Sequence, residues 1–223
     1  HLPSPDWVIG DVGTTIYQVD SEEWRYWLAW EEDVSADWNG LRAKDLQPLF
    51  TDLSSLFLQE ESKQNHYKLS YYVPLQSDIY ALKQEMSRRL NLAGMATSLI
   101  YSVDEAATKG LLDVLPALAT KLHAVEFLME HQGFDVTNTV FAGDSGNDLP
   151  VLTSDIPSVI VANADCETIE QAKSQSQQQG TMTAFYLAQG GFLGMNGNYS
   201  AGILEGVAHY HPAIQDWIKQ ADR

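Results

Sequence analysis

The sequence predicts an α/β fold with two parts, one built on a parallel sheet and one on an antiparallel sheet. From residue 120 onward, helical patterns alternate with short apolar runs, an order typical of a parallel sheet with right-handed crossovers. Between residues 67 and 116, strand and helix patterns indicate an α/β unit on an antiparallel sheet. Hydrophobic residues make up 44% of the 223 positions, so the chain can bury a substantial core.

The chain is strongly acidic, with 30 Asp and Glu against 13 Lys and Arg and a formal net charge of -17. Such a surface repels a phosphate backbone, so we expect no nucleic-acid partner. No apolar run approaches the roughly 18 residues of a membrane span, so we expect no membrane partner. A single cysteine, Cys166, allows no disulfide within one chain, which is typical of a reducing compartment. We therefore expect a cytoplasmic protein, and we expect it to be a monomer.

The chain opens with a hairpin pattern. Residues 5–17 predict a strand, a tight turn at Gly13 and Thr14, and a second strand. Residues 22–32 are rich in tryptophan, tyrosine and acids. These aromatics could stack on sugar rings, but packing in a hydrophobic core is the simpler expectation for most of them.

The next stretch alternates helix and strand patterns. Residues 38–59 have leucines at helical spacing and predict a helix that Pro48 interrupts or restarts. Aromatic and β-branched residues at 67–73 predict a strand. Residues 77–92 predict an amphipathic helix with Ser77 as its N-cap.

Two strands follow, at 97–103 and 110–116, and we expect the second to return to the parallel core. A helix is expected over residues 120–132. Lys121 lies in its first turn, where a cation opposes the helix dipole. Residues that break a local rule are often functional, although a lysine lying along the surface is the alternative.

The last part of the chain alternates strands and helices around a polar loop. A short apolar run at 139–142 predicts a buried strand, and residues 157–164 predict the next parallel strand. A helix begins near Cys166, whose thiol we expect to contribute to packing. Four residues after the glycines near 190 could reach the site by position alone: Asn196, Asn198, Tyr199 and Ser200.

The loop after the strand at 139–142 carries the chemistry; it reads Gly-Asp-Ser-Gly-Asn-Asp over residues 143–148. Asp144 and Asp148 can face one point beyond the carboxyl end of the strand, where open α/β sheets bind ligands. Carboxylates there suit Mg²⁺, which uses one or two of them together with substrate phosphate. An ordinary solvated turn is the alternative, because these residue types are common in turns. Their combination directly after a buried strand favours the metal site.

This loop resembles the fourth motif of haloacid-dehalogenase-type phosphatases. Within them the chain is most similar to the sucrose-phosphate phosphatase group, which includes mannosylfructose-phosphate phosphatases. The resemblance runs from Pro5 to about His209 and is weaker between Ser21 and Asn65. It implies Mg²⁺ dependence and a Rossmann-like core with an inserted α/β cap. The expected division places residues 1–19 in the core, 20–113 in the cap and 114–223 in the core.

The resemblance also implies roles for single residues. Leu115 and Pro116, followed by Lys121, are similar to a segment of the family whose lysine binds phosphate and bridges to the nucleophile. Asp144 is implied as a Mg²⁺ ligand and Asp148 as a second ligand or its support. Asn147 is implied to hydrogen-bond the phosphate or the nucleophile.

Other residues are implied as substrate contacts. The strand at 67–73 is similar to the cap strand that contacts the sugar in the family, so Lys68, Ser70 and Tyr72, which alternation places on one face, are candidate substrate contacts. A solvated cap face explains them nearly as well. Gly13 and Thr14 are expected to form a backbone turn near the site.

One segment departs from the family's pattern. Residues 11–15 read Asp-Val-Gly-Thr-Thr and resemble the nucleophile motif Asp-x-Asp-x-Thr, but Gly13 replaces the second carboxylate. In the resembled group a segment similar to residues 5–17 follows the first catalytic motifs and leads into the cap. We therefore expect the chain to begin after the nucleophile and the acid/base aspartate, with its core incomplete at the N-terminus. Such a chain lacks the carboxylate that covalent catalysis needs.

The first functional hypothesis is a Mg²⁺-dependent phosphomonoesterase that acts on a phosphorylated disaccharide such as sucrose 6-phosphate. Mannosylfructose phosphate and glucosylglycerol phosphate are alternative substrates. A second hypothesis is a catalytically incompetent fragment, or a module of the same fold that binds a sugar or a partner. A third, a phosphotransferase or mutase, is neither supported nor excluded by the sequence.

Overall fold

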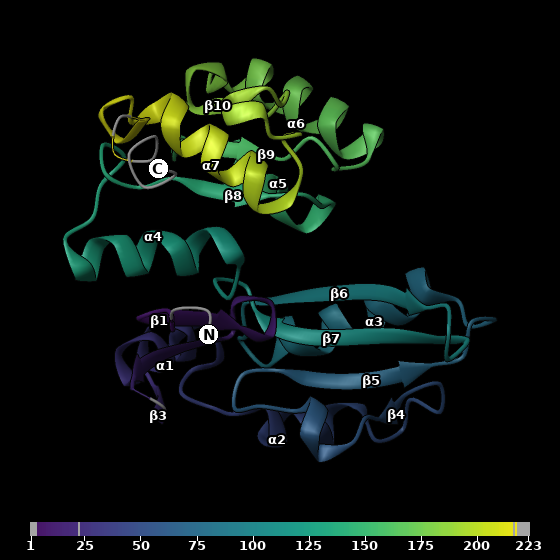
Figure 1. Ribbon diagram of the computed structural model, residues 1–223. Helices are drawn as coiled ribbons and strands as arrows, with labels where there is room; N and C mark the ends of the chain where they lie inside the picture. Colours follow the sequence, from purple (N-terminus) through teal and green to yellow (C-terminus); the bar gives the residue numbers. More distant parts are fainter. Residues whose placement is uncertain (1–3, 22, 216, 218–223) are drawn as a thin grey trace. The chain divides into compact units, whose positions relative to one another are not determined.

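The computed structural model describes residues 4–21, 23–215 and 217, and the chain divides into two compact units, residues 1–125 and 126–223 (Figure 1). Both units combine helices with strands, so the prediction of a mixed α/β fold is confirmed. In the described part of the chain, the parallel sheet is small, and two antiparallel sheets accompany it. The expected three-segment division into core, cap and core stays a prediction.

The first unit begins with an antiparallel sheet of β1 (Trp7–Gly10), β2 (Thr15–Asp20) and β3 (Glu23–Tyr26). The predicted strand, turn and strand are therefore confirmed. Helix α1 (Leu28–Ser35) follows. The expectation that most aromatics of this stretch are core residues is only partly met. Trp30 is fully buried, whereas Trp24 is 57% exposed and Tyr26 is 48% exposed.

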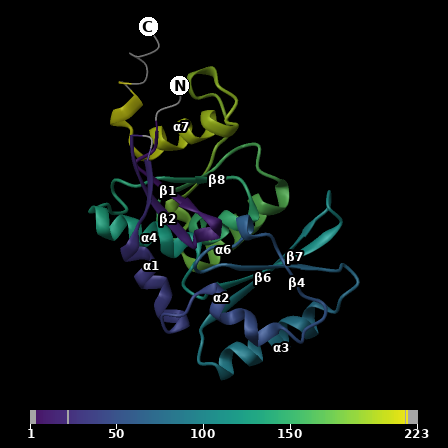
Figure 2. The same ribbon diagram turned by 90° about the horizontal axis from the view of Figure 1, so that it is seen from below.

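A second antiparallel sheet has the order β4 (Phe57–Leu58), β5 (Leu69–Val73), β7 (Lys109–Pro116) and β6 (Thr97–Asp104). Helices α2 (Ala43–Leu46) and α3 (Ile79–Leu92) lie on the same face of this sheet (Figure 2). The strand over residues 110–116 does not return to the parallel sheet as expected. It pairs with β5 and β6 in the antiparallel sheet, because a tight hairpin after Asp104 turns the chain straight back.

Two further details of this unit correct the sequence prediction. The helical pattern over residues 38–59 forms an α-helix only as far as Leu46; the expected interruption at Pro48 is confirmed, because a 3-10 helix with Pro48 near its start follows (Gln47–Phe50), but Phe57–Leu58 form a strand and no helix. Proline lacks the N–H that an α-helix would need there. The N-cap of α3 is Asp78 rather than Ser77, since the Asp78 carboxylate accepts a hydrogen bond of 3.0 Å from the N–H of Ala81.

The second unit is built on the parallel strands β8 (Phe141–Gly143), β9 (Ser158–Ile160) and β10 (Phe185–Leu187), with β9 in the centre. Ile160 packs with Leu152 of α5 (Leu149–Leu152) and Ala172 of α6 (Cys166–Gln179). Val159 points the other way, towards α7 (Tyr199–Tyr210). The sheet therefore has helices on both faces.

Cys166 is exposed at the start of α6, so the expected packing role of its thiol is wrong.

Close contact between α7 and β9 depends on glycine. A Cβ at Gly206 would lie 2.0 Å from Cγ2 of Val159. We expect Gly206→Ala to lower the free energy of unfolding by about 3 kcal/mol, because overpacking outweighs the roughly 1 kcal/mol by which a helix prefers alanine. Urea denaturation measures this change. Gly146→Ala is the control, because a Cβ there meets no atom within 4 Å; equal midpoints for the two variants would contradict the account.

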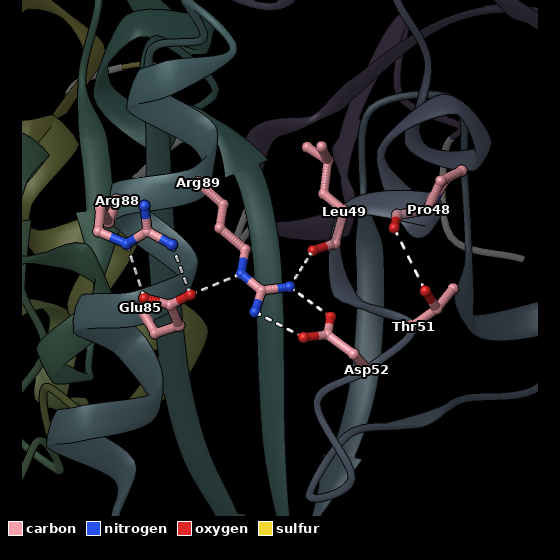
Figure 3. A network of polar contacts seen from close by, with 7 residues as sticks. All are labelled: Pro48, Leu49, Thr51, Asp52, Glu85, Arg88 and Arg89. Carbon is pink, nitrogen blue, oxygen red and sulfur yellow. Dashed lines mark hydrogen bonds and ion pairs between the residues drawn. The ribbon is translucent and has the colours of Figure 1, made fainter.

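An ionic network links helix α3 to the turn that follows α2 (Figure 3). The guanidinium of Arg89 donates to Oε1 of Glu85 at 2.7 Å, to the carbonyl of Leu49 at 2.7 Å, and to both carboxylate oxygens of Asp52. Glu85 also accepts two hydrogen bonds from Arg88. The hydrogen bonds from Arg89 lower the pKa of Asp52 to about 2, and those from Arg88 and Arg89 lower the pKa of Glu85 to about 2.

These lowered pKa values predict how Arg89→Met responds to pH. A carboxylate whose pKa is lower in the folded chain than in the unfolded chain stabilises the fold above its unfolded pKa of about 4, and this stability is lost as the pH falls towards 2. Arg89→Met should therefore have a lower urea midpoint than the parent at neutral pH, and the difference should shrink below about pH 4. Arg25→Met is the control, because Arg25 pairs with Glu23 on its own exposed strand. A difference that does not depend on pH would contradict this explanation.

Candidate functional site

The candidate site lies at the carboxyl end of β8. The parallel register aligns Gly143 with Ile160, so the loops after β8 and β9 leave the sheet at the same edge. Asp144 and Asn147 are exposed on the loop, whereas Asp148 is only 6% exposed. The predicted strand and the polar loop that follows it are both confirmed.

Asp148 organises the loop from within. Its Oδ2 accepts hydrogen bonds from the N–H of Asp144 at 3.1 Å, the N–H of Ser145 at 3.2 Å and the hydroxyl of Ser145 at 3.1 Å. The Ser145 hydroxyl also lies 2.9 Å from Oδ1 of Asn147. A Cβ at Gly143 would lie 2.7 Å from the Asp148 carboxylate, so glycine is needed for this approach. One carboxylate therefore sets the loop conformation that leaves the other exposed.

A cavity of about 280 Å³ opens beside this loop. Its lining includes Asp144, Asp148 and Val161, the residue directly after β9. Helix α7 contributes Tyr199, Ser200 and Ile203. The expectation that Tyr199 and Ser200 reach the site is met. Val161 and Ile203 were not predicted; a signal for Ile203 is its spacing of four residues from Tyr199, which places both on one helix face.

The donor set fits a hard cation only in part. Among the described residues, no group of three or more His, Cys, Asp or Glu side chains could hold a metal ion. The pair Asp144 and Asp148 offers oxygen ligands, the kind that Mg²⁺ prefers. Because Oδ2 of Asp148 is used by the loop, Asp144 is the better placed ligand of the two, and Asp148 fits a supporting role.

Lys121 is the first residue of α4 (Lys121–Gln132), as the sequence predicted for a helix over 120–132. The hydroxyl of Thr120 accepts a hydrogen bond of 3.1 Å from the N–H of His123 and so caps this helix. The turn at Gly13 lies against the helix start, because a Cβ at Gly13 would be 2.7 Å from the carbonyl carbon of Thr120. Gly13 has φ of +96°, which also favours glycine.

Thr14 and Asn65 join two segments of the first unit. Thr14 is fully buried, and its hydroxyl donates to the carbonyl of Asp11 at 2.8 Å. The side-chain amide of Asn65 donates to the Thr14 hydroxyl at 2.8 Å. The structure thus brings together the turn, the start of α4 and Asn65. No sequence signal pointed to Asn65.

The three candidate substrate contacts on β5 and just before it already have partners in the first unit. The amine of Lys68 donates to the carbonyl of Lys63 at 3.2 Å, and the hydroxyl of Tyr72 donates to Glu60 at 2.8 Å. Ser70 is fully buried, and its hydroxyl donates to the same Lys63 carbonyl at 3.3 Å. The alternative of a solvated face therefore does not hold for Ser70, and sugar contact by these residues stays a prediction.

A second cavity, of about 450 Å³, lies within the first unit. The ring of Tyr26 stacks on the ring of His66 at its wall, with centroids 6.0 Å apart and planes inclined by 21°. The rest of the lining is Ala43 and a set of polar side chains: Arg42, Lys44, Glu61, Gln64 and Asn65. An aromatic surface beside charged and amide groups suits a small polar ligand.

Comparison with known proteins places this chain in a known class. The chain is 50% identical over 218 residues to a protein of Nitrosococcus oceani described as a putative HAD-like hydrolase. The matched region covers 98% of this chain and 58% of that protein. It is 30% identical over 207 residues to probable sucrose-phosphatase 2 of Arabidopsis thaliana, covering 90% and 46% of the two chains. The chain thus spans about half the length of these curated relatives. The class is that of haloacid-dehalogenase-like hydrolases.

The family can be stated more closely. A family model described as sucrose-6F-phosphate phosphohydrolase matches residues 1–211, and the chain belongs to this family. The structure of the sucrose-phosphatase from Synechocystis in complex with sucrose and phosphate is similar, with a TM-score of 0.63 at 26% identity over 94% of this chain and 75% of that one. Mg²⁺ dependence is typical of the class. Within the described residues, none of the helices has the length and hydrophobicity of a membrane-spanning segment.

Proposed function

We propose that the protein is a Mg²⁺-dependent phosphomonoesterase that hydrolyses a phosphorylated disaccharide such as sucrose 6-phosphate. One observation carries the proposal: an exposed carboxylate, Asp144, stands at the carboxyl end of a parallel strand on a loop that Asp148 fixes from inside. This is where open α/β sheets bind their ligands. Family membership supports the reaction class.

Each candidate residue has a distinct task in this proposal. Asp144 ligates Mg²⁺, which supplies charge stabilisation to the transferring phosphoryl group when bound. Asp148 keeps the loop in place, and Asn147 donates a hydrogen bond to the phosphate or the nucleophile. Lys121 neutralises phosphate oxygens, for which its ammonium group is suited. Gly13 and Thr14 form the turn that lies against the start of the Lys121 helix.

The cavity in the first unit supports a sugar as the leaving group. Its stacked Tyr26 and His66 rings offer a flat surface for a sugar ring, and its amide and charged groups offer partners for hydroxyls. The structural relative from Synechocystis was solved with sucrose and phosphate. Mannosylfructose phosphate and glucosylglycerol phosphate are the substrates to compare with sucrose 6-phosphate. Contacts from Lys68, Ser70 and Tyr72 would require these side chains to exchange their present partners.

The attacking carboxylate belongs, in this proposal, to a segment outside residues 1–223. Residues 5–17 resemble the family segment that follows the nucleophile motif, so Gly13 and Thr14 form a turn and are not part of that motif. The curated relatives are longer than this chain, which leaves room for such a segment. An aspartate there would attack phosphorus, and a second would protonate the leaving sugar oxygen and then activate water. The segment would also complete a Rossmann-like core around β8.

We place the protein in the cytoplasm and treat it as a monomer.

The test is phosphate release by the full gene product with each of the three sugar phosphates, with Mg²⁺ and with EDTA. We expect Mg²⁺-dependent release that favours one disaccharide phosphate. Sugar binding without release would instead support the binding-module alternative. Release that is equal with EDTA would contradict the role of the Asp144 loop.

A further inference from the structure

Helix α7 carries a buried carboxylate that the proposed chemistry does not use. Glu205 is 6% exposed. Its Oε1 accepts hydrogen bonds of 2.8 Å from both the Tyr186 hydroxyl and the N–H of Gln189, and its Oε2 accepts one of 2.9 Å from the N–H of Gly190. Burial and then the bond to Glu205 raise the pKa of Tyr186 to about 12, so the phenol keeps its proton at neutral pH. Two of the three donors belong to the backbone just after β10.

That backbone begins a loop over residues 189–198, whose two arms touch. A Cβ at Gly190 would lie 2.9 Å from the carbonyl oxygen of Asn196, and a Cβ at Gly197 would lie 2.6 Å from the nitrogen of Gly190. The N–H of Gly191 donates to the carbonyl of Met195 at 2.7 Å. Fixing Gly190 therefore also fixes the returning arm at Gly197.

The returning arm holds the segment that follows β9. The carbonyl of Gly197 accepts a hydrogen bond of 3.0 Å from the N–H of Ala162. Directly beyond the loop, the N–H of Tyr199 donates to the side chain of Asn163 at 2.7 Å. Tyr199 has φ of +48°, a strained value for a residue with a side chain, which these contacts maintain.

The same segment reaches the metal loop from its other side. The N–H of Val161 donates at 3.2 Å to the carbonyl of Gly143, the residue before Asp144. Val161 and Asp144 line one cavity. A continuous path of hydrogen bonds and close backbone contacts thus runs from Glu205 through the 189–198 loop and residues 161–163 to the Asp144 loop.

We propose that Glu205 is a positioning residue of this site: it holds the 189–198 loop, and through residues 161–163 it sets the position of Asp144 and of the cavity wall at Tyr199. The catalytic part of this inference rests on the proposed function. Glu205 itself touches neither metal nor substrate, and it acts through backbone contacts of two neighbouring loops.

The experiment compares Glu205→Gln and Glu205→Ala with the parent, using hydrogen exchange of backbone amides and steady-state kinetics of the full gene product. Glutamine can keep the acceptor at Oε1 but presents an N–H to Gly190. We expect exchange over residues 189–198 to rise at least about tenfold in Glu205→Gln, as expected for loss of one hydrogen bond to a charged group. Exchange over 143–148 should rise as well, and kcat should fall by roughly tenfold or more.

Tyr210→Phe is the matched control for stability. The Tyr210 hydroxyl contacts the carbonyls of Ser158 and Ala184 in the same unit, so its removal should lower the unfolding midpoint without faster exchange over 189–198. Unchanged exchange over 189–198 in a folded Glu205→Gln would overturn the proposal. Faster exchange there with parental exchange over 143–148 would overturn it as well. A parent that releases no phosphate would refute the proposed function, while the exchange data would still decide the role of Glu205.

Discussion

Asp144→Asn is expected to abolish nearly all phosphate release by the full gene product, lowering kcat by about 1,000-fold. The asparagine keeps the size of the side chain but removes the charge that would bind Mg²⁺. Asp148 would still fix the loop, because its contacts go to the backbone of Asp144 and to Ser145. The unfolding midpoint should therefore change little. Saturating Mg²⁺ should restore part of the activity if the remaining ligands still bind the ion.

The matched control for charge is Asp155→Asn, an exposed acid in the same unit. It changes the net charge by the same amount and should keep parental kinetics. Activity of Asp144→Asn within a few-fold of the parent would reject the metal assignment. A large loss of stability in that variant would mean that Asp144 supports the loop rather than the ion.

Lys121→Met is expected to lower kcat by roughly 100-fold and to weaken competitive inhibition by inorganic phosphate. Methionine keeps much of the side chain's length and its apolar stem but removes the ammonium group that would neutralise phosphate oxygens. The start of α4 should stay in place, because the Thr120 cap and the contact with Gly13 involve no Lys121 side-chain atom. Phosphate release and inhibition by phosphate, measured with unfolding midpoints, check this result.

Lys173→Met is the control for this variant, since Lys173 pairs at 3.7 Å with Glu170 on its own helix. It should behave as the parent in kinetics and inhibition. Parental inhibition by phosphate in Lys121→Met would place the phosphate elsewhere. An equal loss in both variants would indicate an effect of net charge on a protein that is already at -17.

Local patterns in the sequence predicted the elements around the site well. A short apolar run followed by two carboxylates, an amide and two glycines was enough to indicate β8 and the polar loop after it. Pairing of distant strands was not predictable in the same way. The strand over residues 110–116 has an apolar pattern that suits either sheet, and only the hairpin with β6 and the register with β5 place it in the antiparallel one.

Roles within the site depended on contacts that spacing does not show. Asp144 and Asp148 look equivalent in the sequence, yet burial and three accepted hydrogen bonds separate a loop-fixing carboxylate from an exposed one. The exposure of Trp24 and Tyr26 follows from their place on β3, an edge strand in the described part of its sheet. Glu205 gave no signal, because two of its three donors are backbone groups about 15 residues earlier in the chain and the third is the distant Tyr186 hydroxyl.

In the proposed reaction, the exposed carboxylate of Asp144 binds a divalent cation beside the phosphate of the substrate. The most direct measurement is an anomalous difference map from crystals of the full gene product that contain phosphate and Mn²⁺ in place of Mg²⁺. We expect a peak about 2.1 Å from a carboxylate oxygen of Asp144, with the phosphate also bound to the ion. A peak at another site, with Asp144 bound to no ion, would contradict it.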